Sequence, residues 1–216
     1  MLELKWAQPP NDYPSSDGKP MGESDPHRKL MMELIQVLEQ HFDAQPHVYV
    51  TGNLLWFYRE HDRRRHLSPD VMVVFGVPQG ARDNYLQWQE GYAPQVVMEL
   101  NSKSTKSRDT GDKFDLYQQL GVEEYYLFDS RQKPVKNRFR AYRRQGGQFI
   151  RVIGESVFSP RLGLELVPVD FRLRLRCPRT GQFLLTDKET ARAAQSEVAR
   201  LRERLRALGI DPETPI

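Results

Sequence analysis

Apolar side chains recur at intervals of three and four residues in the first quarter of the chain, at Leu30, Met31, Leu34, Ile35, Leu38 and Phe42. This spacing predicts an amphipathic helix with one face toward a core. Asp25 suits the N-cap of that helix, and Pro26 suits its first position. The preceding residues 7–22 are rich in Pro, Ser, Gly and Asp, so we expect an irregular arm there.

Short apolar runs follow the helix and predict strands. The runs at 71–75 and 95–100 are nearly continuous, which is typical of central strands covered on both faces. Two further runs, 47–51 and 54–58, are separated by Gly52-Asn53, a pair that favours a tight hairpin turn. Residues 76–94 contain Gly, Pro, Trp and Tyr, and we expect a loop with little regular structure.

The second half of the chain combines a helix with further strands. Residues 110–120 have helical spacing, and Gly121 is suited to end that helix in a left-handed conformation. Residues 125–128 predict a buried strand, and the alternation within 138–176 predicts an antiparallel β extension rich in Arg. The order of elements predicts an α/β fold, a mixed sheet flanked by helices of the restriction-endonuclease-like layout.

A last helix is predicted at about 188–208. Its apolar residues follow alternating steps of three and four, as in a coiled-coil seam, at Ala191, Ala194, Val198, Leu201, Leu205 and Leu208. Docking on its own domain and pairing in a homodimer through this helix both remain open. We therefore divide the chain into an arm (1–22), a nuclease-like domain (23–176) and a helical tail (177–216).

Composition excludes several classes of protein. The start of the chain lacks a signal-peptide pattern and no apolar run could cross a membrane, so we expect a cytoplasmic protein without a membrane partner. Cys177 is the single cysteine, which excludes an internal disulfide. Residues 131–176 hold twelve Lys and Arg against three Asp and Glu, a charge of +9 within a total of +3. Such segregation suits a nucleic-acid partner and equally suits solvated strands.

Candidate chemistry lies on the two central strands. Asp70 opens one of them after Ser68-Pro69, and Glu99 lies near the end of the other. If these strands are antiparallel neighbours, the two carboxylates meet and would need a cation such as Mg²⁺ or Mn²⁺ between them. Lys113, in the first turn of the next helix, could then stabilise charge on a phosphate.

Each of these residues also has a structural explanation. Glu99 could form an ion pair with a nearby Lys or Arg, and Lys113 could be a solvated helix residue. Arg63 and Arg64 precede Asp70 closely enough to flank a bound nucleic-acid backbone, and a solvated hairpin end explains them equally well.

The motifs SPDVMVV, PQVVMELNSKST, D…K…Y and GVEEYYLFD, in this order, resemble the Uma family of restriction endonuclease-like proteins in the PD-(D/E)XK nuclease superfamily. The resemblance covers most of residues 21–176. It implies that Asp70 and Glu99 are metal ligands. It also places Glu23 and His27 at positions where the family carries a Glu and a His; Glu23 is a candidate third ligand, and for His27 a polar first-turn residue is the favoured interpretation.

The chain departs from the superfamily pattern at one position. Asn101 stands where a lysine usually follows the glutamate by two residues. The family resemblance implies that the lysine comes from the next helix, as Lys113, while Lys103 remains an alternative. Lys103 and Lys106 are also candidates for nucleic-acid contacts.

Two functions follow as hypotheses. The first is a Mg²⁺-dependent endonuclease that hydrolyses DNA, with Asp70, Glu99 and Lys113 as its catalytic residues. The second is a nuclease fold that has lost catalysis and acts as a nucleic-acid-binding or dimeric interaction module, which the substitution at Asn101 and the terminal seam both favour.

Overall fold

The structure is a computed structural model that describes residues 11–18, 24–101, 112–135, 137–208 and 211. The chain divides into two compact units, Met1–Leu184 and Leu185–Ile216. The larger unit holds every strand, and the smaller holds the helix α4 (Asp187–Ala207). None of the described helices is both long enough and apolar enough to cross a membrane.

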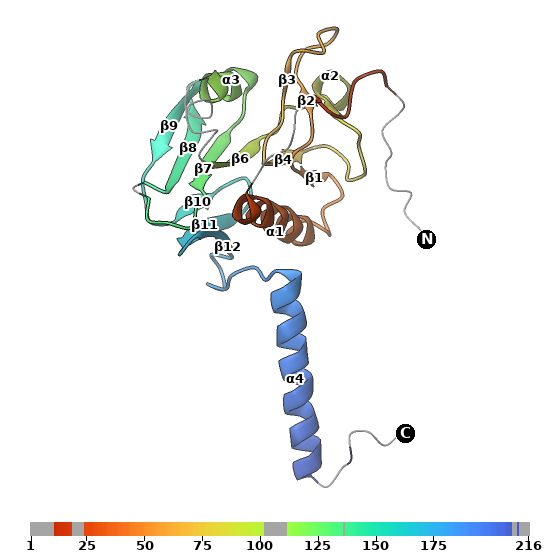
Figure 1. Ribbon diagram of the computed structural model, residues 1–216, viewed down its shortest axis with the longest axis vertical. Helices are drawn as coiled ribbons and strands as arrows, with labels where there is room; N and C mark the ends of the chain where they lie inside the picture. Colours follow the sequence, from red (N-terminus) through yellow and green to blue (C-terminus); the bar gives the residue numbers. More distant parts are fainter. Residues whose placement is uncertain (1–10, 19–23, 102–111, 136, 209–210, 212–216) are drawn as a thin grey trace. The chain divides into compact units, whose positions relative to one another are not determined.

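The larger unit is built on a six-stranded sheet (Figure 1). In spatial order its strands are β1 (Val48–Thr51), β4 (Val71–Phe75), β6 (Val96–Asn101), β7 (Glu124–Asp129), β8 (Phe139–Gln145) and β9 (Gln148–Val152). β6 and β7 are parallel, and every other neighbouring pair is antiparallel. The predicted mixed sheet is therefore confirmed, and the two central strands are antiparallel neighbours, which is the condition that the sequence analysis set for Asp70 and Glu99 to meet.

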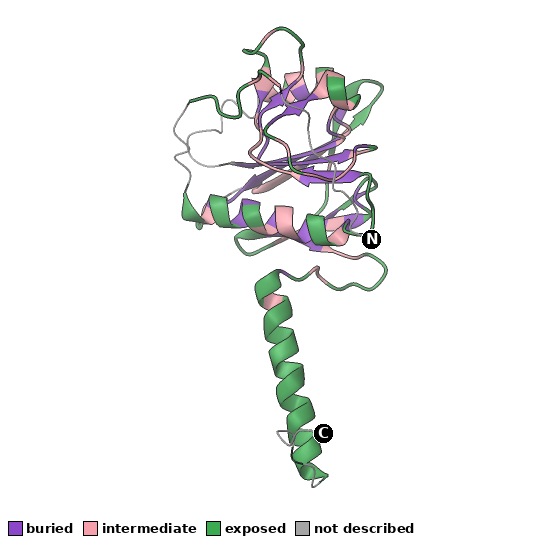
Figure 2. Cartoon of the chain, turned by 90° about the vertical axis from the view of Figure 1, so that its right-hand side faces the viewer, coloured by how far each residue is buried: buried purple, intermediate pink, exposed green. Residues whose placement is uncertain are grey.

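Helices and smaller sheets cover both faces of this sheet. On one face lie α1 (Asp25–His41) and an antiparallel sheet of β10 (Val157–Ser159), β11 (Leu164–Val169) and β12 (Arg172–Arg176). On the other lie α3 (Asp112–Leu120) and a sheet of β3 (His66–Leu67), β2 (Trp56–Phe57) and β5 (Tyr85–Leu86), which leads into α2 (Gln87–Glu90). Figure 2 shows the buried residues concentrated on the strands and on the inner faces of these layers.

The first helix begins as the sequence pattern predicts, shifted by one residue. Ser24 is the N-cap, Asp25 lies in the first turn and Pro26 occupies one of the first two helical positions. The buried stripe extends back from the predicted apolar residues to His27. Gly121 ends α3 with a φ of +89°, as expected for a left-handed residue.

The predicted hairpin at Gly52-Asn53 is wrong. β1 pairs with β4, whereas β2 pairs with β3 and β5. Asn53 does have a positive φ of +53°, but Gly52 is required for a different reason: a Cβ there would lie 2.0 Å from the carbonyl oxygen of Asp70. The backbone N–H of Asn53 donates to the backbone carbonyl oxygen of Pro69 at 2.8 Å. The glycine therefore allows the chain to pass directly against the start of β4.

Two further expectations need correction. Residues 76–94 are not merely a loop, because they contain β5, which adds in parallel to β2, and α2. The extension at 138–176 is antiparallel as predicted, but it is split: β8 and β9 continue the main sheet, whereas β10, β11 and β12 form a separate one. In β12 the predicted alternation holds, since Leu173 and Leu175 are buried between arginines that are not.

Candidate active site

The Asp70 carboxylate is fixed at the junction of β4 and β6. The register pairs Val71 with Met98, and one further step places Asp70 opposite Glu99. Asp70 Oδ2 accepts the backbone N–H of Leu100 at 2.6 Å, so the side chain continues the pairing of the two strands. Its side chain is only 12% exposed. The register thus places the two predicted residues side by side on neighbouring strands.

Glu99 is a buried carboxylate with two donors from α3. Its side chain is 3% exposed. Oε1 accepts from Lys113 Nζ at 2.8 Å and from the Tyr117 hydroxyl at 2.6 Å. Lys113 and Tyr117 are four residues apart, which places both on the same face of the helix. The structure therefore brings Lys113 to Glu99, as the sequence analysis expected of the helix after β6, and it also forms the ion pair that was the structural alternative.

The Tyr117 hydroxyl is a feature that sequence reasoning missed. Tyr117 lies within the segment 110–120 whose spacing predicts a helix, and its ring is fully buried and stacked on Trp56 at 6.1 Å between ring centroids. Burial raises its pKa well above the usual value, and the negative charges of Glu99 and Asp70 raise it further. The hydroxyl is therefore protonated at neutral pH and acts as a donor. A buried tyrosine needs a partner for its hydroxyl, which was the available signal.

His27 was also underestimated. We favoured a polar first-turn residue, yet His27 is 3% exposed, and its Nε2 lies 3.3 Å from Asp70 Oδ1. Its position three residues before Leu30 and seven before Leu34 extends the apolar stripe of α1, which was the signal for its burial. Asp70 is consequently held from β6 by Leu100 and from α1 by His27.

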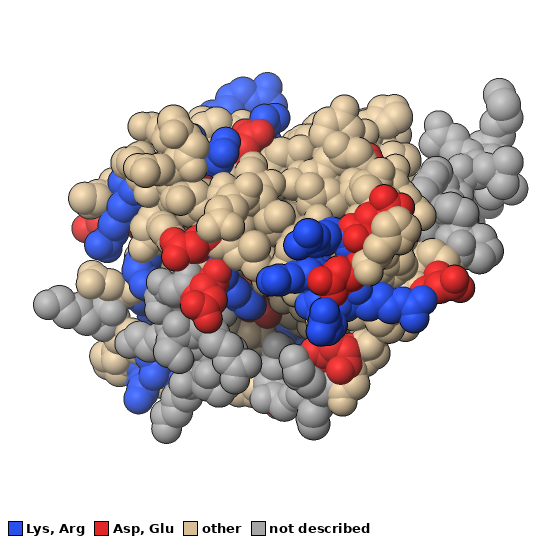
Figure 3. Space-filling view, turned by 90° about the horizontal axis from the view of Figure 1, so that it is seen from above, with Lys and Arg blue, Asp and Glu red and all other residues tan. Residues whose placement is uncertain are grey.

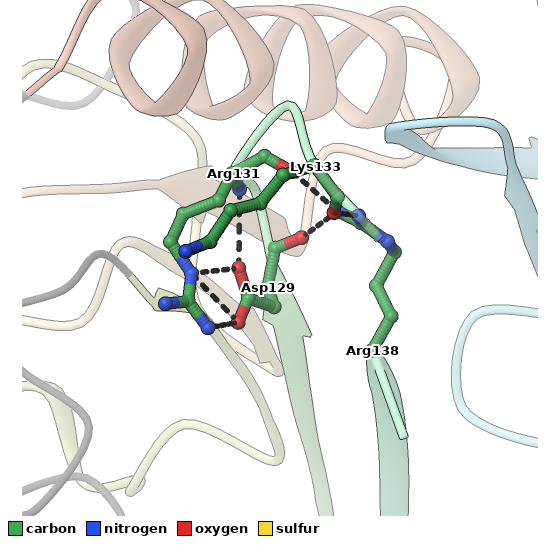
Figure 4. Close-up of polar contacts among 4 residues, drawn as sticks. All are labelled: Asp129, Arg131, Lys133 and Arg138. Atoms are coloured by element: carbon green, nitrogen blue, oxygen red, sulfur yellow. Dashed lines mark hydrogen bonds and ion pairs between the residues drawn. The ribbon is translucent and has the colours of Figure 1, made fainter. Parts of the chain in front are cut away.

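A second polar cluster lies where β7 ends (Figure 4). The parallel register places Asp129 beside Asn101, two residues beyond Glu99. Arg131 Nε donates to Asp129 Oδ1 at 2.8 Å and to Oδ2 at 3.0 Å, and the Arg131 amide donates to Oδ1 at 3.1 Å. Burial alone would raise the pKa of Asp129, but the bonds from Arg131 outweigh it and hold that pKa below its usual value. The turn after β7 is thus pinned at the edge of the sheet where β6 also ends.

Arg138, the residue before β8, completes this turn. Its guanidinium donates to the carbonyl oxygens of Asp129, Arg131 and Lys133. β8 and β6 flank β7 on opposite sides, and Figure 4 shows Arg131 and Arg138 on opposite sides of Asp129. Arg131 therefore lies on the side of β7 that faces β6.

Many arginines of the basic segment 131–176 are engaged within the fold. Four of them form ion pairs with acidic residues: Arg131 with Asp129, Arg161 with Glu123, Arg172 with Glu33, and Arg176 with Glu165. Figure 3 shows one face of the molecule, on which Lys and Arg intermix with Asp and Glu. Four of the twelve basic residues of the segment are thus paired with acidic side chains within the fold.

Arg63 and Arg64 lie between β2 and β3, away from the contacts of the carboxylate pair. Arg64 Nε lies 3.5 Å from Asp62, and the Arg63 guanidinium lies 5.7 Å from the centre of the Tyr13 ring. Both arginines line an open hollow of about 1010 Å³, together with Trp88. Glu23, Lys103 and Lys106 fall outside the described residues.

The candidate site contains oxygen atoms that could bind a metal ion and side chains that contact them. Among the described residues, no group of three or more His, Cys, Asp and Glu has an arrangement suited to a metal ion. Asp70 and Glu99 stand opposite each other on neighbouring strands, and an ammonium and a phenol contact the Glu99 carboxylate. The structure thus combines a mixed sheet between helices with an aspartate ahead of one strand, a glutamate in the neighbouring strand and a lysine in contact with that glutamate.

Comparison with known proteins identifies the family of the chain. The chain belongs to the Uma2 family, described as "Putative restriction endonuclease", which it matches over residues 4–176. A crystal structure of a putative nuclease belonging to DUF820 from Anabaena variabilis is similar to it, with 17% identity, coverage of 79% of this chain and 82% of that chain, and a TM-score of 0.48. No curated protein shows a significant match.

Proposed function

We propose that this protein is a metal-dependent endonuclease that hydrolyses phosphodiester bonds in DNA, with Asp70, Glu99 and Lys113 as its catalytic residues. The observation that carries the proposal is the contact of Lys113 with Glu99 at 2.8 Å, beside an aspartate that the strand register places opposite that glutamate. Membership of a family described as restriction endonucleases supports the reaction class.

The donor set fits Mg²⁺ or Mn²⁺. Both ions prefer oxygen ligands, and Mg²⁺ is commonly held by one or two carboxylates while water and substrate phosphate fill its other positions. Asp70 and Glu99 would hold the ion, with Glu23 as a candidate further ligand. When bound, such an ion activates water and neutralises charge on the scissile phosphate.

The surrounding side chains would keep the carboxylates in position. Leu100 and His27 contact separate oxygen atoms of Asp70, so its orientation is fixed from two elements. The Tyr117 hydroxyl holds Oε1 of Glu99. Lys113 is 26% exposed, so its ammonium can reach solvent and stabilise negative charge that develops on a phosphate.

Contacts with the flanking nucleic-acid backbone are assigned to Arg63, Arg64, Lys103 and Lys106. Arg63 and Arg64 line the hollow beside β2, on the sheet layer that also carries Trp56 against Tyr117. Each phosphate contact would contribute to salt-dependent binding.

The experiment pairs metal binding with cleavage. Wild-type protein should bind Mn²⁺ in calorimetry and convert supercoiled plasmid to nicked or linear forms when Mg²⁺ is present. Asp70→Asn and Glu99→Gln should each lose both properties. Asp170→Asn, in an exposed turn with a φ of +51° that suits asparagine, is the matched control and should retain them.

The outcomes separate the enzyme from the binding module. Metal binding that survives Glu99→Gln, or cleavage that is equal in all four proteins, would exclude this site. DNA binding without cleavage or metal binding would favour a nuclease fold that has lost catalysis, the alternative raised by Asn101.

A further inference from the structure

The helix α4 presents an apolar stripe to solvent. It contains 21 residues, and none of them is buried. Four large apolar side chains on it are exposed: Val198 by 48%, Leu201 by 45%, Leu205 by 36% and Leu208, at its C-cap, by 73%. Most of the stability of an amphipathic helix in a protein comes from packing of its apolar face. We therefore expect another surface to cover the apolar stripe of α4.

The spacing of the stripe identifies the kind of partner. Ala191, Val198 and Leu205 occupy a positions of a heptad repeat, and the remaining apolar residues Ala194, Leu201 and Leu208 occupy d positions. In the central heptad the a residue Val198 is β-branched and the d residue Leu201 is a leucine, and this combination favours a parallel two-stranded coiled coil. In register, each of these residues would meet its own counterpart, so one sequence supplies both sides of the interface.

The flanking charges are complementary in the same arrangement. Glu197 occupies a g position and Arg202 the e position of the following heptad, which face each other across a parallel dimer. Within the helix Glu197 contacts Arg200 at 2.7 Å, but its side chain is 48% exposed and stays accessible to a second helix. The preceding g and e residues, Thr190 and Gln195, are neutral, so they introduce no like-charge repulsion.

Both ends of α4 carry residues that stabilise the helix. Thr186 and Glu189 form a capping box, in which the Glu189 amide donates to the Thr186 hydroxyl and Glu189 accepts from the Thr186 amide. Arg204 and Arg206 lie in the last turn, where positive charges interact favourably with the helix dipole. The helix can thus form with little further ordering.

We propose that α4 pairs with α4 of a second copy of this chain as a parallel coiled coil, with Glu197 of each helix beside Arg202 of the other. The inference does not depend on the nuclease function. Because the seam spans only about three heptads, the dimer should dissociate on dilution.

The oligomeric state of the full chain tests this. Sedimentation or light scattering over a series of concentrations should show a monomer–dimer equilibrium. Leu201→Glu places one carboxylate from each helix in the seam and should raise the dissociation constant of the dimer at least about 100-fold. Ser196→Glu adds the same charge on the opposite side of the helix and should leave the equilibrium unchanged.

A charge exchange tests the pairing and its direction. Glu197→Arg should raise the dissociation constant of the dimer about tenfold. The double variant Glu197→Arg/Arg202→Glu should return that constant to the wild-type value. Glu197→Arg/Arg204→Glu, which would restore an antiparallel pairing, should not. A chain that is monomeric at every concentration, a dimer insensitive to Leu201→Glu, or rescue through Arg204 alone would each overturn the proposal.

Discussion

Lys113 Nζ lies 2.8 Å from Glu99 Oε1, and the two residues are 14 positions apart on different elements. The pair serves two purposes at once. It balances a carboxylate that is 3% exposed, and it holds an ammonium at the place where the proposed reaction needs positive charge. Stability and catalysis can therefore be separated by the choice of substitution.

Lys113→Met should destabilise the fold by about 2 kcal/mol, because it leaves a buried carboxylate without its cation. The double variant Lys113→Met/Glu99→Gln should recover part of that loss, since a neutral amide needs no cation, yet it should not recover cleavage. Urea unfolding and a plasmid assay measure the two effects. Lys188→Met, on an exposed residue of α4, is the control; a double variant less stable than Lys113→Met would argue against this reading.

Tyr117→Phe should keep the stacking on Trp56 and cost about 1–2 kcal/mol for the lost donor to Glu99. The raised pKa of Tyr117 predicts a second result. Since its hydroxyl stays protonated above the usual tyrosine range, removing it should not reduce the tyrosinate absorbance that develops between pH 9 and pH 11. A clear reduction in that range would show that the hydroxyl ionises normally.

Gly52→Ala should disturb the site without touching any catalytic side chain. The added Cβ would lie 2.0 Å from the Asp70 carbonyl oxygen, so the backbone around Asp70 must move. We expect a loss of about 2–4 kcal/mol in stability together with a fall in Mn²⁺ affinity. Gly181→Ala meets open space at a φ of +69° and should cost only about 1 kcal/mol, with metal affinity unchanged. Equal effects of the two variants would contradict the close approach.

Asp129→Asn should destabilise the protein in a pH-dependent way. Its pKa is lowered in the folded state, so the ionised carboxylate contributes stability above its unfolded pKa of about 3.9, and this contribution is lost as the pH falls through the folded value. The gap in stability between wild type and variant should therefore be large at pH 7 and narrow below about pH 4. Urea denaturation at a series of pH values measures it, and a gap that widens in acid would reverse the assignment.

The central strands could be predicted because their signal is local. Val71–Phe75 was predicted to the residue, and the run ending in Leu100 matches β6 within one position at each end. Their antiparallel pairing was a condition of the hypothesis and not a result of the sequence pattern, whereas the choice of Lys113 followed from helical spacing and the family resemblance.

The pairing of the short strands could not be predicted in the same way. β2 joins β5 in parallel across an intervening segment, and no local pattern specifies that partner. Gly52-Asn53 matched the composition of a hairpin turn, although Gly52 is required by its contact with Asp70. His27 and Tyr117 carried a periodic signal that fits core packing as well as a site, so only their contacts distinguish the two.

The amide of Leu100 and the carboxylate of Asp70 tie the proposed chemistry to strand registration. If β4 slipped by one residue against β6, every side chain of β4 would turn to the opposite face, and this bond would be lost with it. If the proposed function is correct, a mispaired chain would therefore not cleave nucleic acid, and cleavage would begin only when both central strands have reached their final register.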